Sequence, residues 1–417
     1  MGHDAMSENL VTQFVGVSVL VLLTLALTGF VLLIRSRLAP VGGVDLTINS
    51  AAPVVVEVGL PLLDVLIKKD IVLPAACGGR GNCGQCVVTV VAGGGEAFPN
   101  ERAHLSSREI AEGKRLACML KVRQAMTIEI PDGMVDSRRI ACRVVSKRHI
   151  TPFMMELNLV VANDGEQFHF KAGQYLLLEA PPYQLNFTEF ELDPSFEKLW
   201  VEGGLLKLQA GTSEVTRRAY SLASDPTETG HMTLVVRIAL PPSNVTNAVP
   251  PGIVSSWVFG VHPEQKMNVA GPFGDFLVQE GDREMVLIAG GAGIAPIRSI
   301  IFEQLASGFS RKVTFWYGVR NAQELCYEAE FDALEKAHEN FSWHAALSAP
   351  KADSQWTGHR GFIHNVVHDR YLVSHPAPEE LEYYLCGPPV MSAAVKKMLI
   401  DLGVDNRSIF FDDFGSV

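Results

Sequence analysis

The sequence predicts a multidomain chain that begins with one N-terminal transmembrane helix, followed by a small β-rich domain, an antiparallel β-barrel and a doubly wound α/β domain. Three observations lead to this prediction. An uncharged apolar run occupies residues 9–34, short strand-like segments broken by Pro and Gly fill residues 137–280, and apolar strands alternate with Gly-rich turns and helical stretches over residues 283–417. A chain of 417 residues is long enough for several domains with their own cores.

Charge and cysteine content exclude some classes of function. The formal net charge is −11 and no run of Lys or Arg occurs, so we expect no nucleic-acid partner. Seven cysteines are present, and three of them lie within ten residues, which favours a metal or cluster site in a reducing compartment over a set of disulfides. Cys142 and Cys326 stand apart from the other cysteines and are expected in the core.

The apolar run at residues 9–34 is the expected membrane anchor. As a helix it would be roughly 39 Å long, against a hydrocarbon core of about 30 Å. The alternative is a cleaved signal peptide, but the run is too long for one and is preceded by Asp4 and Glu8 instead of basic residues. Arg35 and Arg37 follow the run, so the positive-inside rule predicts a single-pass protein whose later domains are cytoplasmic.

The first domain is expected over residues 38–133. A helix should start at Pro61, because proline suits the first helical position. Four strand-like patches accompany it, at residues 44–49, 54–58, 87–91 and 126–130.

Four cysteines of this domain have the spacing of an iron–sulfur site. Cys77, Cys83 and Cys86 form a C-x5-C-x2-C run, and Cys118 follows alone. A [2Fe–2S] cluster takes four thiolates, and the glycines of the run let the backbone turn its N–H groups toward the sulfurs. A structural zinc site is the alternative, but zinc ligands usually come as short-spaced pairs at both ends of a module. The run resembles plant-type ferredoxins of the β-grasp fold, with five residues in the first spacing where that pattern has four.

The barrel, expected over residues 137–280, carries a candidate flavin site in the run Arg218-Ala-Tyr-Ser. On a strand, Arg218 and Tyr220 share one face and Ser221 points to the other. We expect Arg218 to pair with the pyrophosphate of FAD, Tyr220 to stack on the isoalloxazine ring and Ser221 to hydrogen-bond near its reactive N5.

A helix expected to start near Gly252 adds to this site. Its free N–H groups, with the hydroxyls of Ser255 and Ser256, are candidates to bind phosphate oxygens. The barrel also contains an insert at about residues 183–212, whose aromatic residues argue against disorder. We expect the insert to be either a docking surface for partner subunits or a surface flap; its aromatic residues include Phe187, Phe190, Phe196 and Trp200.

The last domain, residues 283–417, carries a candidate dinucleotide site. Gly291 and Gly293 follow an apolar strand and open a helix, which is the context of a phosphate-binding turn, although Pro296 stands where the usual fingerprint has its third glycine. Cys386 and Gly387 end another strand at the same edge of the sheet, where open α/β sheets bind ligands. We expect Cys386 to pack against the nicotinamide; an ordinary buried thiol is the alternative.

The order of these motifs resembles the ferredoxin-NADP reductase superfamily. RxYS, GxxSS, GPFGDF, GGAGIAP, YGVR and CGPP follow one another over residues 137–417. This resemblance implies hydride transfer from NADH to FAD, with Tyr220, Ser221 and Cys386 around the reacting rings and Phe414 covering the flavin. NADPH stays open as a donor, because Arg320 at a strand end is placed to meet a 2′-phosphate.

With the anchor and the ferredoxin domain included, the whole chain resembles the NADH-oxidising subunits of sodium-translocating NADH:quinone oxidoreductases. This implies a place in the bacterial inner membrane, with other membrane subunits that accept electrons, reduce ubiquinone and export Na⁺. Because hydride brings two electrons and a [2Fe–2S] centre accepts one, FAD is expected between NADH and the cluster. The alternatives are a membrane-anchored NADH-dependent reductase component for an oxygenase and a membrane redox sensor.

Overall fold

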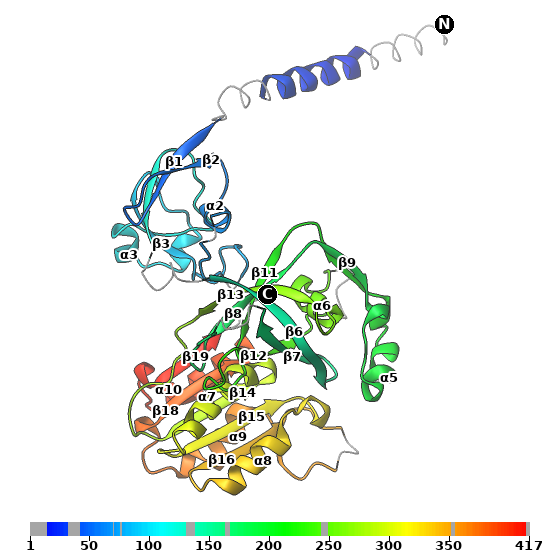
Figure 1. Cartoon of the computed structure of the whole chain (residues 1–417), viewed down its shortest axis with the longest axis vertical. Helices are drawn as coiled ribbons and strands as arrows, with labels where there is room; N and C mark the ends of the chain where they lie inside the picture. Colours follow the sequence, from blue (N-terminus) through cyan, green and yellow to red (C-terminus); the bar gives the residue numbers. More distant parts are fainter. Residues whose placement is uncertain are drawn as a thin grey trace, which may run out of the picture.

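The computed structural model describes residues 15–31, 42–69, 71–75, 77–130, 138–162, 167–242, 249–351 and 355–413. Three globular domains follow one another along the chain, as Figure 1 shows from cyan through green to red. A helix near the N-terminus, drawn in blue, projects away from them.

The N-terminal helix covers residues 15–31, and its apolar side chains are exposed. Within it, the hydroxyls of Thr24 and Thr28 donate to carbonyl oxygens four residues earlier, so they have partners inside the helix. The two ends of the span expected at residues 9–34 lie outside the described residues. Among the residues that are described, no helix combines the length and apolarity needed to span a membrane.

The first domain is a mixed five-stranded sheet in the order β2-β1-β5-β3-β4. Strands β1 and β5 run parallel and the other neighbouring strands run antiparallel. A short helix, α2, starts directly after Pro61 and buries its leucines against the sheet, which is the β-grasp arrangement. The elements are β1 (Gly43–Ile48), β2 (Val54–Glu57), α2 (Leu62–Ile67), β3 (Val87–Ala92), α3 (Ser107–Ala111), β4 (Lys114–Leu116) and β5 (Met126–Glu129).

The second domain is an antiparallel sheet in the order β11-β8-β13-β6-β7-β12. A bridge between Leu222 and Leu234 joins the ends of the sheet, so it closes into a barrel. Apolar side chains that alternate along the strands fill the interior. The elements are β6 (Arg138–Thr151), β7 (Met154–Val161), β8 (Tyr175–Ala180), β11 (Thr216–Ser221), β12 (His231–Arg237), α6 (Ile253–Gly260) and β13 (Lys266–Phe273).

The insert in the barrel packs its apolar side chains into a core that it shares with the barrel. Its two strands, β9 (Tyr183–Asn186) and β10 (Gln209–Thr212), pair antiparallel and enclose α5 (Pro194–Glu202). Phe187 and Trp200 are fully buried there, and the Trp200 indole donates to the Pro152 carbonyl at 2.9 Å. The aromatic residues therefore hold the insert against the barrel and do not form an exposed docking face.

The third domain is a six-stranded parallel sheet in the order β17-β16-β15-β14-β18-β19. Alternate residues of each central strand belong to two different cores, one on each face of the sheet, which explains why these strands are apolar throughout. The strands are β14 (Met285–Gly290), β15 (Val313–Val319), β16 (Phe341–Leu347), β17 (His359–Arg360), β18 (Glu382–Gly387) and β19 (Ile409–Asp413). The helices are α7 (Ile294–Ala306), α8 (Glu328–Ala337), α9 (Ile363–Arg370) and α10 (Pro389–Asp401).

The strand order reverses between β14 and β18. The chain moves outward from β14 through β15 and β16, then returns to place β18 on the other side of β14. In open α/β sheets, ligands bind at such a switch point, at the carboxyl ends of the strands.

Candidate functional site

The four cysteines of the first domain form two pairs of thiols. The Cys83 thiol donates to Cys77 Sγ at 3.4 Å, and Cys86 and Cys118 are joined by a second side-chain hydrogen bond. Each iron of a [2Fe–2S] cluster takes two of the four protein thiolates, so two pairs fit the donor set that this cluster needs. Within the described part of the chain, the two pairs do not converge into a group of three or more His, Cys, Asp or Glu side chains that could hold a metal ion, so the fit rests on the donor set and its pairing.

The loop favours a thiolate at Cys77. The hydrogen bond from the Cys83 thiol, together with backbone hydrogen bonds from Asn82, Cys83 and Arg80, outweighs burial and lowers the pKa of Cys77 to about 4. Such N–H groups stabilise thiolates and tune the metal that they bind. The loop reaches this shape through positive φ angles, which favour glycine, at Gly78, Gly79, Gly81 and Gly84.

The expected flavin residues lie on strand β11, at the side of the barrel that faces the cysteine loop. The Arg218 guanidinium donates to the Arg217 carbonyl at 2.6 Å, and a side chain at Gly78 would overlap it. Burial lowers the pKa of Arg218, and the charge of Arg80 lowers it further. A half-buried guanidinium beside a second cation is suited to an anion, so the site fits the pyrophosphate of FAD.

Tyr220 and Ser221 complete this strand. Tyr220 packs against the barrel core, and burial raises the pKa of its phenol. Ser221 is buried, and its hydroxyl donates to Asp412 Oδ2 at 3.2 Å. Asp412 belongs to β19, so this contact joins the barrel to the nucleotide domain. Asp412 is not among the site residues predicted from the sequence. The one feature that could have pointed to it is its place two residues before Phe414, the predicted cover of the flavin. Phe414 itself lies outside the described residues.

Helix α6 presents the expected phosphate-binding turn. Gly252 is its N-cap and gives no side-chain cap, so the first N–H groups have no acceptor there. Ser255 Oγ donates to the Gly252 carbonyl at 3.1 Å and accepts from Ala239 N at 3.2 Å, so it braces the turn. Ser256 Oγ is buried and has no hydrogen-bond partner among the described residues. A buried hydroxyl without a partner on this turn is suited to donate a hydrogen bond to an oxygen atom of a ligand.

The glycine turn of the last domain lies at the switch point of the sheet. Gly291 has a φ of +54°, and Gly293 precedes helix α7 without a side-chain cap. A Cβ at Gly293 would overlap the Cys386 carbonyl, so only glycine allows α7 to start this close to β18. Cys386 is fully buried in β18, and Gly387 ends the strand. A glycine turn that opens a helix in this way is the arrangement that binds a dinucleotide phosphate.

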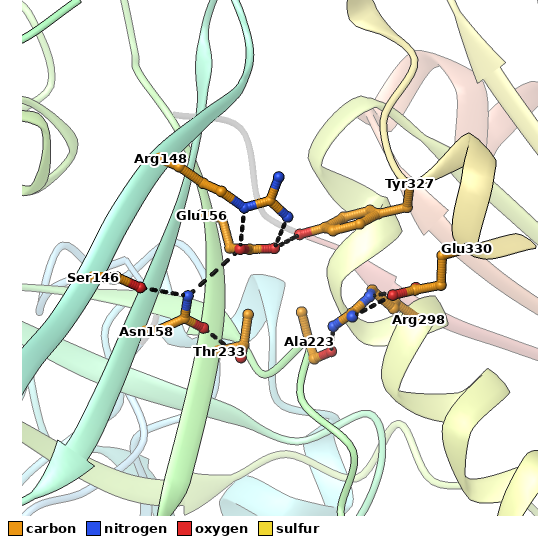
Figure 2. A network of polar contacts seen from close by, with 9 residues as sticks. All are labelled: Ser146, Arg148, Glu156, Asn158, Ala223, Thr233, Arg298, Tyr327 and Glu330. Atoms are coloured by element: carbon orange, nitrogen blue, oxygen red, sulfur yellow. Dashed lines mark hydrogen bonds and ion pairs between the residues drawn. The ribbon is translucent and has the colours of Figure 1, made fainter. Parts of the chain in front are cut away.

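A polar network fixes the nucleotide domain on the barrel (Figure 2). Glu156 of β7 accepts from Arg148 Nε and from the Tyr327 hydroxyl, both at 2.6 Å. Arg298 of α7 binds Glu330 through two hydrogen bonds of 2.7 Å and donates to the Ala223 carbonyl at 2.6 Å. Because α7 begins at the glycine turn, these contacts also hold that turn at a set position relative to strand β11, which carries the expected flavin residues.

Comparison with known proteins agrees with these three domains. Family models match a 2Fe-2S iron-sulfur cluster binding domain at residues 46–123, an oxidoreductase FAD-binding domain at 184–277 and an oxidoreductase NAD-binding domain at 287–397. The F subunit of the Na(+)-translocating NADH-quinone reductase of Yersinia enterocolitica is 44% identical over 403 residues, which cover 96% of this chain and 98% of the relative. The F subunit of the same enzyme in Methylococcus capsulatus is 43% identical over 401 residues, with the same coverage. The chain belongs to the family of these F subunits.

The predicted cofactor domains are thereby confirmed for this member of the family. A solved structure, an Amycolatopsis cytochrome P450 reductase, has the same three-domain fold, with a TM-score of 0.61 and 24% identity over 89% of this chain and 98% of that chain. The likeness shows that the fold predicted for the ferredoxin, flavin and nucleotide domains is correct.

Proposed function

We propose that this chain is the NADH-oxidising subunit of a respiratory membrane complex that reduces quinone and exports Na⁺. In this role it takes hydride from NADH and passes single electrons through FAD and the [2Fe–2S] cluster to partner subunits. The observation that carries the proposal is the position of strand β11, which meets the cysteine loop at Arg218 and the nucleotide domain at Ser221. One strand thus contacts both neighbouring redox domains.

The chain's own residues bind and orient the three groups. Arg218, Gly252 and Ser256 hold the FAD phosphates, Tyr220 and Ser221 orient the flavin ring, and the glycine turn with Gly291, Gly293 and Gly387 holds NADH beside Cys386. The cluster is held by Cys77, Cys83, Cys86 and Cys118. When bound, FAD supplies the conversion between a two-electron hydride donor and a one-electron acceptor. Ser221 is buried, and its hydrogen bond to Asp412 fixes the serine hydroxyl at the junction.

Residues 9–34 are proposed as a single-pass anchor in the bacterial inner membrane, with the three domains on the cytoplasmic side. The exposed apolar face of the helix at residues 15–31 supports this, because side chains such as Leu20 and Leu22 are about two-thirds exposed, at 67% and 66%. Such a surface is stable in lipid and unfavourable in water. Removing residues 1–37 should release the protein from membranes while NADH still bleaches the flavin. Continued membrane binding by the truncated chain would contradict the anchor.

The insert is proposed to dock partner subunits through exposed apolar side chains of helix α5. Phe187, Phe190 and Trp200 are buried, but Leu199 and Val201 of α5 are 39% and 56% exposed. Replacing both with Asp should prevent co-purification of the membrane subunits and leave NADH oxidation by the isolated chain unchanged. Normal assembly of the double variant would rule out docking through these side chains.

The electron path is tested on the purified protein. NADH should bleach the flavin absorbance first and then produce the EPR signal of a reduced [2Fe–2S] cluster. Cys83→Ser should remove the EPR signal and keep flavin reduction, whereas Arg218→Leu should lose FAD. Absence of flavin bleaching in the unaltered protein would overturn the proposed function and favour the redox sensor.

A further inference from the structure

Tyr175 joins the barrel to the cysteine loop. It is the first residue of β8, and it lies directly opposite Ser221 in the β8–β11 ladder. Its hydroxyl donates to Gln85 Oε1 at 2.9 Å, and Gln85 lies between Cys83 and Cys86 in the loop. A single side chain therefore reaches from the strand paired with β11, which carries the expected flavin residues, to a loop residue between two expected cluster ligands.

Apolar packing surrounds this hydrogen bond. Tyr175 is 5% exposed, and its ring lies 5.8 Å from the ring of Phe273 in the same barrel. Val72 of the first domain is 2% exposed and belongs to the same buried cluster as Tyr175, Leu177 and Phe273. Because the tyrosine end of this part-buried hydrogen bond lies among apolar side chains, the bond is stronger than it would be on an open surface.

The phenol is a hydrogen-bond donor at neutral pH. Burial raises the pKa of Tyr175 well above its usual range, and the nearby Cys83 thiol adds to the rise. The hydrogen bond to Gln85 therefore joins two uncharged groups.

A second contact holds the other end of the loop. Gly78 lies so close to Arg218 that a side chain there would overlap the guanidinium and the Arg217 carbonyl. The loop is thus held against the barrel at Gly78 and at Gln85, on either side of Cys83. Removing the Gln85 contact should loosen the end that carries Cys83 and Cys86.

We propose that Tyr175 is a positioning residue for electron transfer, whose hydrogen bond to Gln85 docks the cluster loop on the barrel beside strand β11. The proposal rests on the proposed function. In the step concerned, the reduced flavin loses one electron and the oxidised cluster gains it; Tyr175 neither gains nor loses a proton or an electron.

The test compares Tyr175→Phe with the unaltered full-length protein. Stopped-flow absorbance should show the same rate of flavin bleaching by NADH, while reduction of the cluster slows about fivefold, as expected for the loss of one hydrogen bond of ordinary strength. Hydrogen exchange of the backbone amides of residues 77–86 should rise by a similar factor, and the EPR spectrum of the chemically reduced cluster should stay the same.

Tyr383→Phe is the matched control. It removes a phenol that donates to the Pro378 carbonyl at 2.7 Å, within the nucleotide domain and away from the loop, and it should change neither cluster reduction nor loop exchange. Val72→Ser, which weakens the same interface without touching the hydrogen bond, should act in the same direction as Tyr175→Phe and provides a second test if that variant folds poorly.

Unchanged cluster reduction and loop exchange in both Tyr175→Phe and Val72→Ser would overturn the proposal. Slower flavin bleaching in Tyr175→Phe would also overturn it, because the residue would then act on the flavin itself. Failure of NADH to bleach the flavin in the unaltered protein would instead contradict the proposed function.

Discussion

Ser221 of strand β11 donates a hydrogen bond to Asp412 of strand β19, with an Oγ to Oδ2 distance of 3.2 Å. The serine is buried, so the contact lies inside the junction between the barrel and the nucleotide domain. A hydroxyl held by a carboxylate has a fixed orientation, which is what hydride transfer to a neighbouring ring requires. We therefore expect Asp412 to position the Ser221 hydroxyl.

We expect Asp412→Ala to slow flavin bleaching by NADH about tenfold, because the Ser221 hydroxyl loses a charged acceptor and turns freely. FAD content and the EPR signal of the chemically reduced cluster should be unchanged. The control is Asp401→Ala, which removes only an exposed ion pair with Lys397 at 2.7 Å on α10. Equal bleaching rates in the two variants would show that Ser221 does not depend on Asp412.

Gly293→Ala should weaken NADH binding. The added Cβ would overlap the Cys386 carbonyl, so the start of α7 must move away from β18. Overpacking of this kind typically costs about 1–3 kcal/mol, so we expect the KM for NADH to rise about tenfold or more while FAD and cluster content stay normal. Gly29→Ala is the control, since its Cβ would meet no atom within 4 Å. A normal KM would show that the turn does not bind the nucleotide.

Local patterns identified most of the candidate site, because several of its parts are each built from one short run. Cys77, Cys83 and Cys86 share one loop, and Arg218, Tyr220 and Ser221 share one strand. Each run has the side chains and spacing that its ligand needs, so sequence alone could suggest the chemistry. The parallel sheet was predictable for the same reason, since its strands are apolar on both faces.

Contacts between distant residues were not predictable. Ser221 and Asp412 are 191 residues apart, and Tyr175 and Gln85 are 90 residues apart, so nothing in the flanking sequence marks either pair. The insert shows a related limit. Its aromatic residues suggest a binding face, but a pattern of aromatics does not tell whether they are exposed or pack against the rest of the domain, as Trp200 does.

Glu101→Gln should destabilise the first domain by about 3 kcal/mol, because it leaves Arg115 buried without its counter-ion. The two side chains are 0% and 4% exposed and 2.8 Å apart, and Glu101 also accepts from the backbone N–H of Leu116, two residues before Cys118. The urea concentration at which the cluster absorbance disappears should therefore fall. Glu57→Gln is the control, since its ion pair with Lys68 is exposed and contributes about 1 kcal/mol or less.

The same carboxylate should make this domain acid-sensitive. Burial opposes ionisation of Glu101, but hydrogen bonds from Arg115 and from the N–H groups of Phe98 and Leu116 outweigh it and lower the pKa. A group with a lowered pKa in the folded state stabilises the fold above its unfolded pKa, about 4.3, and this contribution is lost as the pH falls through the folded value. The stability difference between Glu101→Gln and the unaltered domain should therefore be full at pH 7 and shrink below about pH 4. A difference independent of pH would exclude the charge as its cause.

Tyr327→Phe should loosen the nucleotide domain from the barrel without unfolding either. The Tyr327 hydroxyl donates to Glu156 at 2.6 Å, and its ring lies 4.6 Å from the Arg298 guanidinium, which the phenylalanine retains. Loss of this one hydrogen bond should slow flavin bleaching by NADH about fivefold, because the glycine turn before α7 is then held less firmly relative to strand β11. Electron transfer from flavin to cluster should keep its rate, which separates this junction from the one at Tyr175. Tyr383→Phe is again the control, and equal bleaching rates in the two variants would show that the Glu156 network has a purely structural role.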